Sequence, residues 1–313
     1  FRPHVIFGTG GFVSAPVMFA CGALRKIGLS RSRLFVYSPD AQPGLLNQIA
    51  GRLADRVGVV FEQTARWFDM KRVAIVGFPV RRELLDLDRS AARTALDIPA
   101  DRFVIFAFGG SQGSRVINQA VVDALSHLQS RRDELFVLHT TGRIRSDGYD
   151  AVADTASQVQ ALDLAELDSW YRRCEYFDQI AVAYAAADVV ICRGGISTLT
   201  EIGVAGLPAI IVPLSTAAED HQAVNARTLE RAGAARVLFE EAEWCAEKDS
   251  AVALGLPGER LAAVVVELLL AGSDRASMAT AARNLQRRDS LELIMQEIDN
   301  LVQGRRSQTL SLE

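Results

Sequence analysis

Residues 192–225 read CRGGISTLTEIGVAGLPAIIVPLSTAAEDHQAVN, a stretch that contains a glycine turn, a helix pattern and an apolar strand pattern. An apolar strand predicted over 188–192 runs into the glycine pair Gly194-Gly195, and a helix is predicted over 196–205. Such a junction is an anion site, because unpaired backbone N–H groups and the positive end of the helix dipole face one point. Glu201 lies one turn further along, where a carboxylate can accept hydrogen bonds from the vicinal hydroxyls of a ribose. The stretch therefore predicts a nucleotide-sugar site; the plainer alternative is a helix with Glu201 merely solvated.

Strand-like and helix-like segments alternate along the chain. Several strand segments are continuous apolar runs, as in Phe103-Val-Ile-Phe-Ala-Phe108, which is typical of parallel strands covered by helices on both faces. The alternation predicts an α/β protein with a doubly wound architecture. Strands are predicted over 4–7, 33–37, 57–61, 73–76, 103–108, 135–139, 188–192 and 209–213, and helices over 13–27, 43–53, 114–129, 179–186, 196–205, 218–231, 258–270 and 289–302.

A domain boundary is predicted near Gly77-Phe-Pro-Val-Arg-Arg82, which follows one strand and precedes a short charged segment. We expect a first domain over 1–82 and a second over 83–272. Residues 273–303 are expected to form C-terminal helices that pack back toward the first domain. Residues 304–313 are polar and are expected to form a loose tail.

The composition is that of an ordinary globular chain. Hydrophobic residues make up 49% and charged residues 23% of the 313 positions, and the net charge of −4 gives no indication of a nucleic-acid partner. The cysteines at 21, 174, 192 and 245 show no metal-ligand spacing, which predicts a reduced cytosolic chain. The most apolar run, 261–271, is shorter than the roughly 18 residues that a membrane span needs.

A second glycine turn, Gly109-Gly-Ser-Gln-Gly113, follows the strand over 103–108 and opens a helix. Its glycines allow a ligand to approach the backbone closely, and Ser111 and Gln112 add hydrogen-bonding groups. The spacing is neither that of a P-loop nor that of the dinucleotide fingerprint, which argues against a P-loop NTPase or a dehydrogenase. Taken alone, the turn is equally consistent with a tight strand–helix connection that binds nothing.

Three further segments are weaker candidates. Gln222 and Asn225 share one helix face and could bind a ligand, or they could form an ordinary polar face behind an Asp220 N-cap. The backbone at Phe177 is expected at the carboxyl end of a strand, where open α/β sheets bind ligands, although a core role for its ring fits equally. Gly10-Gly11 forms a third turn into a helix, with a buried helix entry as the alternative.

These residues resemble a known family, the MurG glycosyltransferases. Gly109-Gly-Ser-Gln-Gly-Ser-Arg115, with Asn118 after it, is similar to the family's GGSQGA-R--N motif. Gly10-Gly-Phe-Val-Ser14 resembles the GGYVS loop, and Gly77-Phe-Pro-Val-Arg81 resembles the GNPVR hinge. The resemblance runs from about residue 1 to 240 and rests on several motifs together. Further segments that match in order and spacing are 176–188, 193–202, 205–208 and 220–225.

The resemblance implies a GT-B fold, in which two Rossmann-like domains face each other across a cleft, with the first domain incomplete in this chain. The implied reaction is an inverting transfer of GlcNAc from UDP-GlcNAc to lipid I, which gives lipid II for peptidoglycan. No cofactor or metal is required in the family, since cationic and helix-dipole groups can stabilise the leaving diphosphate. The implied partners are UDP-GlcNAc, an undecaprenyl-linked lipid acceptor and the cytoplasmic face of the bacterial inner membrane.

The resemblance also implies roles for individual residues. Arg81 would lie at the hinge near the nucleotide, and Ser111, with Gln112 beside it, would lie near the diphosphate. The backbone at Phe177 would contact the uracil, and Gln222 and Asn225 would hold the GlcNAc hydroxyls. The segment that would wrap the diphosphate and ribose consists of Ile196, Ser197, Thr198, Leu199, Thr200 and Glu201, with Glu201 on the ribose. The glycines of the three turns that resemble the family's glycine loops are Gly10, Gly11, Gly109, Gly110, Gly113, Gly194 and Gly195.

The chain departs from the family on the acceptor side. The family has an earlier glycine loop with a His, a candidate general base, and we expect that region to be absent here. Tyr37-Ser-Pro-Asp40 stands where the family has HEQN, so Asp40 is a candidate catalytic residue and the base is otherwise unknown. The alternatives are a GT-B transferase that uses another lipid acceptor such as diacylglycerol, a UDP-GlcNAc-binding module without catalysis, and a GT-B hydrolase or epimerase.

Overall fold

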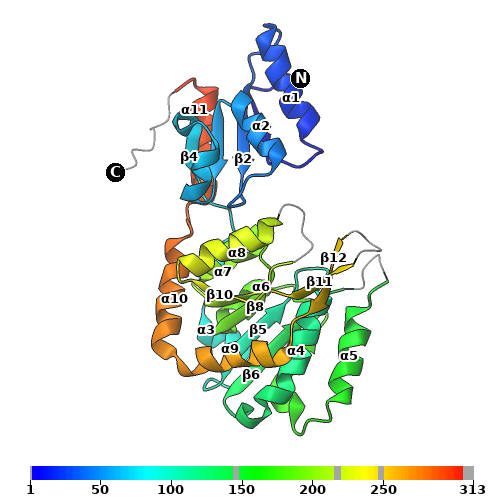
Figure 1. Ribbon diagram of the computed structural model, residues 1–313. Coiled ribbons are helices and arrows are strands. Elements are labelled where there is room, and N and C mark those ends of the chain that lie inside the picture. The colour runs from blue at the N-terminus through cyan, green and yellow to red at the C-terminus, as the bar shows by residue number, and fades with distance from the viewer. Residues whose placement is uncertain (1, 144–147, 215–219, 246–249, 306–313) are drawn as a thin grey trace. The chain divides into compact units, whose positions relative to one another are not determined.

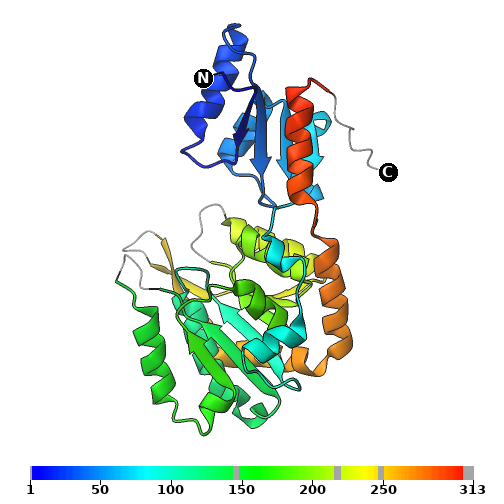
Figure 2. The same ribbon diagram turned by 180° about the vertical axis from the view of Figure 1, so that it is seen from behind.

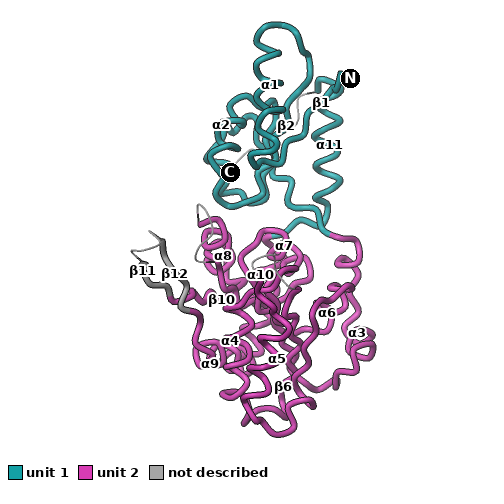
Figure 3. Tube along the Cα trace, turned by 90° about the vertical axis from the view of Figure 1, so that its right-hand side faces the viewer, with its two compact units in different colours: residues 1–80, 286–313 teal, residues 81–285 magenta. Residues whose placement is uncertain are grey.

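The chain forms two compact units. The computed structural model describes residues 2–143, 148–214, 220–245 and 250–305. Unit 1 consists of residues 1–80 and 286–313, and unit 2 of residues 81–285 (Figure 3). The chain therefore passes from one unit to the other after Val80 and returns after Leu285. Within the described ranges, no helix is both long and apolar enough to span a bilayer.

Unit 1 is built on a parallel sheet with the strand order β1-β2-β3-β4. Residues from α1 and α2, among them Met18 and Ala50, pack on one face against the strand residues Leu34, Val36 and Val57. Helix α11 contacts β1 and β2 and lies across the other face (Figure 2). The elements are β1 (Val5–Gly8), α1 (Ala15–Lys26), β2 (Arg33–Ser38), α2 (Leu45–Leu53), β3 (Arg56–Val59), β4 (Val73–Ile75) and α11 (Ser290–Val302).

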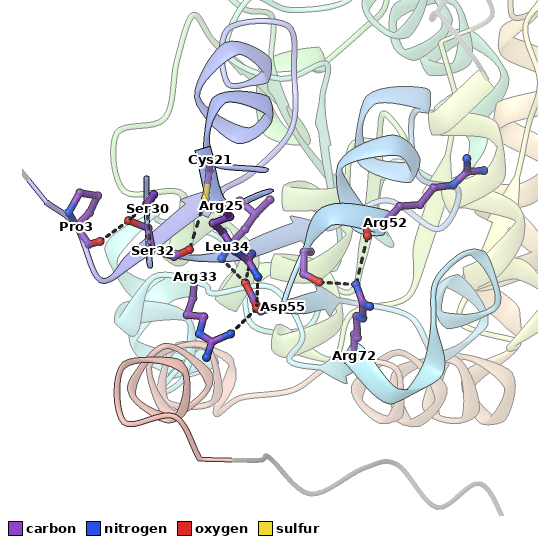
Figure 4. A network of polar contacts seen from close by, with 11 residues as sticks. Pro3, Cys21, Arg25, Ser30, Ser32, Arg33, Leu34, Arg52, Asp55 and Arg72 are labelled. Carbon is purple, nitrogen blue, oxygen red and sulfur yellow. Dashed lines mark hydrogen bonds and ion pairs between the residues drawn. The ribbon is translucent and has the colours of Figure 1, made fainter. Parts of the chain in front are cut away.

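Buried and half-buried ion pairs fix the helices of unit 1 to its sheet. Asp55 accepts hydrogen bonds from the Arg25 guanidinium at 2.6 and 2.9 Å, from Arg33 at 3.0 Å and from the Leu34 N–H at 2.8 Å (Figure 4). The Arg56 guanidinium makes a two-point contact with the Glu297 carboxylate at 2.7 and 3.1 Å. Two-point pairs of this kind fix geometry as well as adding energy, so β3 holds α11 although the two are far apart in sequence.

Unit 2 is built on a longer parallel sheet with the order β10-β9-β8-β5-β6-β7 (Figure 1). Strands β5, β6 and β7 follow one another from the middle of the sheet to one edge, and β8, β9 and β10 from the middle to the other edge. The direction of winding therefore reverses between β5 and β8. Open α/β sheets bind ligands outside the carboxyl ends of the strands at such a reversal. The strands are β5 (Phe103–Phe108), β6 (Leu135–Thr140), β7 (Tyr171–Cys174), β8 (Val189–Cys192), β9 (Ala209–Ile211) and β10 (Ala235–Val237).

Helices cover both faces of this sheet. On one face α4 and α9 pack together over Ile105, Val137 and Ile191, which are nearly or completely buried. On the other face α3 and α6 pack together over Val104 and Phe136. The helices are α3 (Arg89–Ala95), α4 (Arg115–Leu128), α5 (Ala151–Ala161), α6 (Ile180–Ala186), α7 (Ile196–Ala205), α8 (His221–Arg231), α9 (Gly258–Leu270) and α10 (Gly272–Asn284), and an antiparallel pair joins β11 (Glu241–Cys245) to β12 (Ser250–Gly255).

The doubly wound α/β architecture predicted from the sequence is confirmed, and the predicted elements agree with observed ones within a few residues. The sequence did not predict β7, β10, β11, β12, α3 or α5. Strand β7 reads Tyr-Arg-Arg-Cys and lies at the edge of the sheet with Arg172 and Arg173 exposed, so it lacks the apolar pattern of an inner strand. The helix predicted over 179–186 is α6, which begins at Ile180, after Gln179.

Candidate functional site

Two glycine turns meet at the reversal point of the unit 2 sheet. Strands β5 and β8 are neighbours, with Ile105 paired to Val189 and Ala107 to Ile191. Strand β5 leads through Gly109–Gly113 into α4, and β8 leads through Arg193–Gly195 into α7. Both helix N-termini therefore open at the same edge of the sheet, as an anion site requires.

The turn after β5 depends on its glycines. Gly110 and Gly113 have φ of +91° and +70°, a left-handed conformation that side chains with a Cβ rarely adopt. Ser111 and Gln112 lie exposed at the tip of the turn. The Ser114 hydroxyl accepts a hydrogen bond from the Ile117 N–H at 3.3 Å and caps α4. The turn thus presents polar side chains and backbone to solvent from a rigid base.

The turn after β8 is held by α8. The Gly194 N–H donates to the Gln222 side-chain oxygen at 3.2 Å, and the Gly194 carbonyl accepts from the Asn225 amide at 3.4 Å. The same Gln222 oxygen accepts from the Leu214 N–H at 3.1 Å. A Cβ on Gly194 would lie 2.4 Å from the Gln222 backbone oxygen. The two side chains expected on the sugar therefore make backbone contacts that fix the shape of this turn.

Arg193 links the two turns and was not singled out from the sequence. Its guanidinium donates to the Ser114 hydroxyl at 2.6 Å and to the carbonyls of Val212 and Pro213 at 3.1 and 3.2 Å. It also pairs with the fully buried carboxylate of Glu240. The sequence signal was its position, since Arg193 lies between a buried strand and a glycine pair.

Glu201 lies at the same edge, one turn into α7. The Tyr184 hydroxyl donates to one oxygen of its carboxylate at 3.2 Å, and the Arg81 guanidinium lies 3.9 Å from the other oxygen. Burial raises the pKa of Glu201, while Arg81 and the Tyr184 hydrogen bond oppose that rise. Burial beside Glu201 also raises the pKa of Tyr184 well above its ordinary value, so the phenol keeps its proton and donates.

The first three residues of α7 are at least partly exposed, and the next two are buried. Ser197 is exposed, and Ile196 and Thr198 are partly exposed. Leu199 and Thr200 are completely buried, so their side chains belong to the core of unit 2. Of the six residues expected to wrap the diphosphate and ribose, these two have side chains out of reach of a bound molecule.

Phe177 lies between β7 and α6 with its ring partly buried. The ring packs edge-on against Phe106 with the centroids 6.4 Å apart, and Phe106 in turn contacts Tyr184 at 5.7 Å. The aromatic cluster therefore connects the Phe177 backbone to the residue that orients Glu201.

Unit 1 carries its own polar edge at the carboxyl ends of β1 and β2. Gly10 and Gly11 have φ of +89° and +78°, and the Ser14 hydroxyl donates to both of their carbonyls at 2.8 and 3.0 Å. Asn47 is buried and donates to the Tyr37 carbonyl at 3.4 Å, while its side-chain oxygen has no partner among the described residues. Asp40, the candidate base, follows β2 and is partly buried.

Metal-ligating side chains do not cluster in the described part of the chain, where no three His, Cys, Asp or Glu residues gather as ligands of one ion. The N-termini of α4 and α7 leave backbone N–H groups at the carboxyl edge of the sheet.

Unit 2 thus combines a reversal of strand order, two glycine turns and an oriented carboxylate, which is typical of a nucleotide-binding α/β fold, and unit 1 is a second parallel α/β unit. Residues 104–294 match the model of the glycosyltransferase family 28 C-terminal domain. The chain is 36% identical over 297 residues to the UDP-N-acetylglucosamine–N-acetylmuramyl-(pentapeptide) pyrophosphoryl-undecaprenol N-acetylglucosamine transferase of Salinibacter ruber, covering 95% of this chain and 71% of that protein. It is 35% identical to the protein of the same name from Desulforudis audaxviator, covering 96% of this chain and 74% of that one.

The chain belongs to the MurG family of glycosyltransferases. Solved structures agree in fold. The crystal structure of Acinetobacter baumannii MurG has a TM-score of 0.68 at 23% identity and covers 95% of this chain and 73% of its own. Anabaena Alr3699/HepE in complex with UDP has a TM-score of 0.61 at 15% identity and covers 96% of this chain and 78% of its own. The family and the GT-B fold expected from the sequence are therefore confirmed.

Proposed function

We propose that this protein transfers GlcNAc from UDP-GlcNAc to lipid I, with inversion at the anomeric carbon, and so forms lipid II. The observation that carries the proposal is the placement of Glu201, held by Tyr184 and Arg81, one turn beyond a helix N-terminus at the reversal point of a parallel sheet. The named relatives, which are N-acetylglucosamine transferases acting on a pyrophosphoryl-undecaprenol acceptor, support the choice of donor and acceptor.

In this proposal the donor lies along the carboxyl edge of unit 2. The ribose hydroxyls donate to Glu201, whose second carboxylate oxygen is kept in place by the Tyr184 hydroxyl. The diphosphate lies over the N-terminus of α7 and beside Ser111 and Gln112. The uracil contacts the backbone at Phe177. Gln222 fixes Gly194 through its side-chain oxygen, which leaves its NH₂ group to donate to a GlcNAc hydroxyl.

The chemistry needs stabilisation of the leaving diphosphate. Negative charge develops on the UDP oxygens as the anomeric bond breaks, and the backbone N–H groups at the start of α7 already point to that region. Arg193 and the side chains of α8 fix the turn before the reaction, so little reorganisation is needed when the charge forms. We propose that this preorganised backbone performs the task without a cofactor or metal.

The acceptor is assigned to unit 1. Two buried polar atoms of unit 1 have no hydrogen-bond partner among the described residues. They are the side-chain oxygen of Asn47, on α2, and the hydroxyl of Ser38, at the end of β2. Buried polar atoms without partners are costly, and a bound hydroxyl or amide would satisfy them. Asp40 follows the same strand and is the candidate that would take the proton from the attacking hydroxyl.

Docking at the cytoplasmic face of the inner membrane is part of the proposal. Phe12 and Val13 are 93% and 95% exposed, and further apolar side chains of the same segment, Val17, Ile27 and Leu29, are more than half exposed. Residues 1–80 carry ten Lys and Arg against four Asp and Glu, in a chain whose net charge is −4. Apolar side chains together with excess positive charge favour an anionic lipid surface.

Transfer to two acceptors tests the proposal. The chain would be incubated with radiolabelled UDP-GlcNAc and either lipid I or diacylglycerol in detergent, and labelled lipid would be separated by chromatography. We expect label in the lipid I reaction alone. Label in diacylglycerol would establish the other acceptor, and UDP-GlcNAc binding without label in either lipid would establish a binding module; both outcomes would contradict the proposal.

A further inference from the structure

A completely buried histidine lies near the Gly109–Gly113 turn of unit 2. His139 is the fifth residue of β6 and has no exposed surface. One ring nitrogen, Nε2, lies 3.1 Å from the side-chain oxygen of Asn118 on α4. The other, Nδ1, lies 3.0 Å from the hydroxyl of Tyr171 on β7. The imidazole therefore joins a helix and two strands through polar contacts in an otherwise apolar core.

The contacts allow one arrangement of hydrogens. The Asn118 amide nitrogen donates to the Thr141 carbonyl at 2.9 Å, which fixes the orientation of the amide because a carbonyl can only accept. The Asn118 oxygen then faces His139 and can only accept, so Nε2 carries the hydrogen. Nδ1 is left as an acceptor for the Tyr171 hydroxyl. The result is a chain of hydrogen bonds that runs in one direction, from Tyr171 through His139 and Asn118 to Thr141.

The remaining hydrogen of the Asn118 amide is also used. It donates to the Tyr149 hydroxyl at 3.3 Å, and that hydroxyl donates to Asp154 at 3.3 Å. The Arg115 guanidinium lies over the Tyr149 ring at 4.4 Å. A buried polar network whose members are all satisfied is rigid, so Asn118 has a single position.

The network ends at the backbone that supports the glycine turn. A Cβ on Gly113 would lie 2.1 Å from the Thr141 carbonyl oxygen, and a Cβ on Gly142 would lie 2.2 Å from the Gly113 nitrogen. The Thr141–Gly142 backbone thus presses directly against Gly113. Any shift of the Thr141 carbonyl moves the end of the Gly109–Gly113 turn with it.

We propose that His139 is a positioning residue of the nucleotide site, which acts through Asn118 and Thr141 to set the Gly109–Gly113 turn for the donor diphosphate. The role in binding rests on the proposed function, while the positioning of the turn stands on the contacts alone. Burial lowers the pKa of His139 to about 3, with the nearby positive charge of Arg173 adding to the effect. The neutral form that the network requires is therefore the form present at physiological pH.

The experiment compares His139→Phe, His139→Gln and Leu135→Ala. The Phe variant keeps an aromatic ring and removes both ring nitrogens. The Gln variant places an NH₂ donor near the position of Nε2 and retains the bond to Asn118. Leu135 is a fully buried residue at the start of the same strand, so its truncation measures the effect of lost core packing away from the turn.

Two measurements are made on each variant. Hydrogen–deuterium exchange of the peptides that cover 109–114 and 140–143 reports the turn itself. Calorimetric titration with UDP-GlcNAc reports binding. We expect His139→Phe to speed exchange in both peptides and to weaken binding about tenfold, because Asn118 loses its partner and no longer holds the Thr141 carbonyl against the turn. We expect His139→Gln to stay within about threefold of the wild type, and Leu135→Ala to lower the melting temperature with binding unchanged.

The outcomes distinguish the positioning of the turn by His139 from the binding of UDP-GlcNAc at the site. If wild-type protein bound no UDP-GlcNAc but His139→Phe still loosened the turn, the proposed function would fail and the positioning would stand. Unchanged exchange and unchanged binding in His139→Phe would overturn the inference. Equal loss of binding in Leu135→Ala would also overturn it, because the effect would then be one of general stability. Nitrogen-15 NMR of the imidazole should show hydrogen on Nε2 and no titration between about pH 5 and 8, where an ordinary histidine titrates.

Discussion

At the residue scale the site depends on how Glu201 is held. Burial of the carboxylate raises its pKa, and the Arg81 guanidinium and the Tyr184 hydrogen bond offset part of that rise. Folding therefore favours the protonated carboxyl, while the proposed contact with ribose hydroxyls favours the ionised one. A residue whose environment opposes the charge it needs is typical of a functional position.

The raised pKa gives a pH prediction for binding. Affinity for UDP-GlcNAc should fall on acidification, beginning at a higher pH than the ordinary value of a Glu side chain, because protonation removes one acceptor for the ribose. Calorimetric titrations over a pH series would measure this. The diphosphate of UDP-GlcNAc is esterified at both ends, so the donor itself does not titrate in that range.

Glu201→Gln is the matched control. It should bind more weakly than the wild type at neutral pH and lose the acid dependence. Because the folded-state pKa is raised, the stability cost of ionised Glu201 is absent below its unfolded pKa and is fully present above its folded pKa. The Gln variant should therefore melt at or above the wild-type temperature at neutral pH. A wild-type affinity that did not change with acidification would contradict the assignment of Glu201.

Single residues show what the sequence could predict about the site. Glu201 and the glycines were identifiable because chemistry and local spacing coincide in one short stretch. Tyr184, Arg193 and His139 were not identified, because their roles come from partners 17, 79 and 21 residues away in the chain. Gln222 and Asn225 were predicted as sugar contacts, and their bonds to Gly194 became visible only in the structure.

At the element scale the turns are built by close backbone packing. Gly194 is packed against the first turn of α8, whereas a Cβ on Gly195 would meet no described atom within 4 Å. Gly195 also has φ of −70° and ψ of 134°, which any residue adopts. Close packing therefore requires glycine at position 194, whereas neither packing nor backbone conformation requires it at position 195.

This difference predicts that one of two neighbouring substitutions is destabilising and the other nearly neutral. Gly194→Ala should destabilise the protein by about 1–3 kcal/mol, because the new methyl group overlaps the backbone of Gln222. Gly195→Ala should change stability by less than about 0.5 kcal/mol. Urea unfolding followed by circular dichroism would measure both. Equal stability of the two variants would show that α8 does not hold this turn in the way described.

Elements were predictable where their pattern is local. The strand over 103–108 and the helix over 196–205 have the observed bounds, because an unbroken apolar run and a helix that begins after a glycine turn are unambiguous. Strand β10 has three residues, and α3 is a short helix that carries Arg89 and Arg93. Arg93 is nevertheless buried, since it donates to the Ala186 carbonyl and pairs with Asp188. Such contacts stabilise α3, although the local sequence pattern does not predict a helix there.

At the scale of the whole molecule, charge is unevenly distributed. Unit 1 contains the segment with ten basic and four acidic residues, while the chain as a whole is acidic. The same segment carries Phe12 and Val13, which are almost completely exposed. The proposed membrane contact therefore belongs to unit 1 and the proposed donor site to unit 2.

A vesicle assay tests the membrane contact. The chain should cosediment with vesicles of phosphatidylglycerol and phosphatidylethanolamine, and the bound fraction should fall with added salt because screening weakens the attraction. The Phe12→Ser, Val13→Ser double variant should bind several-fold more weakly. Leu291→Ser, which removes an exposed apolar side chain from α11 in the same unit, serves as the control and should bind as the wild type does. Equal binding by the double variant would exclude this surface.

We propose that the carboxyl edge of the unit 2 sheet binds UDP-GlcNAc through Glu201. Calorimetric titration of the wild type and of Glu201→Ala with UDP-GlcNAc tests it most directly. We predict one site per chain in the wild type, with a Kd between about 1 μM and 1 mM, the usual range for enzyme substrates. Loss of a charged hydrogen-bond acceptor costs about 1.5–3 kcal/mol, so the variant should bind about 10- to 150-fold more weakly. Absence of binding to the wild type, or the same affinity in both proteins, would contradict the claim.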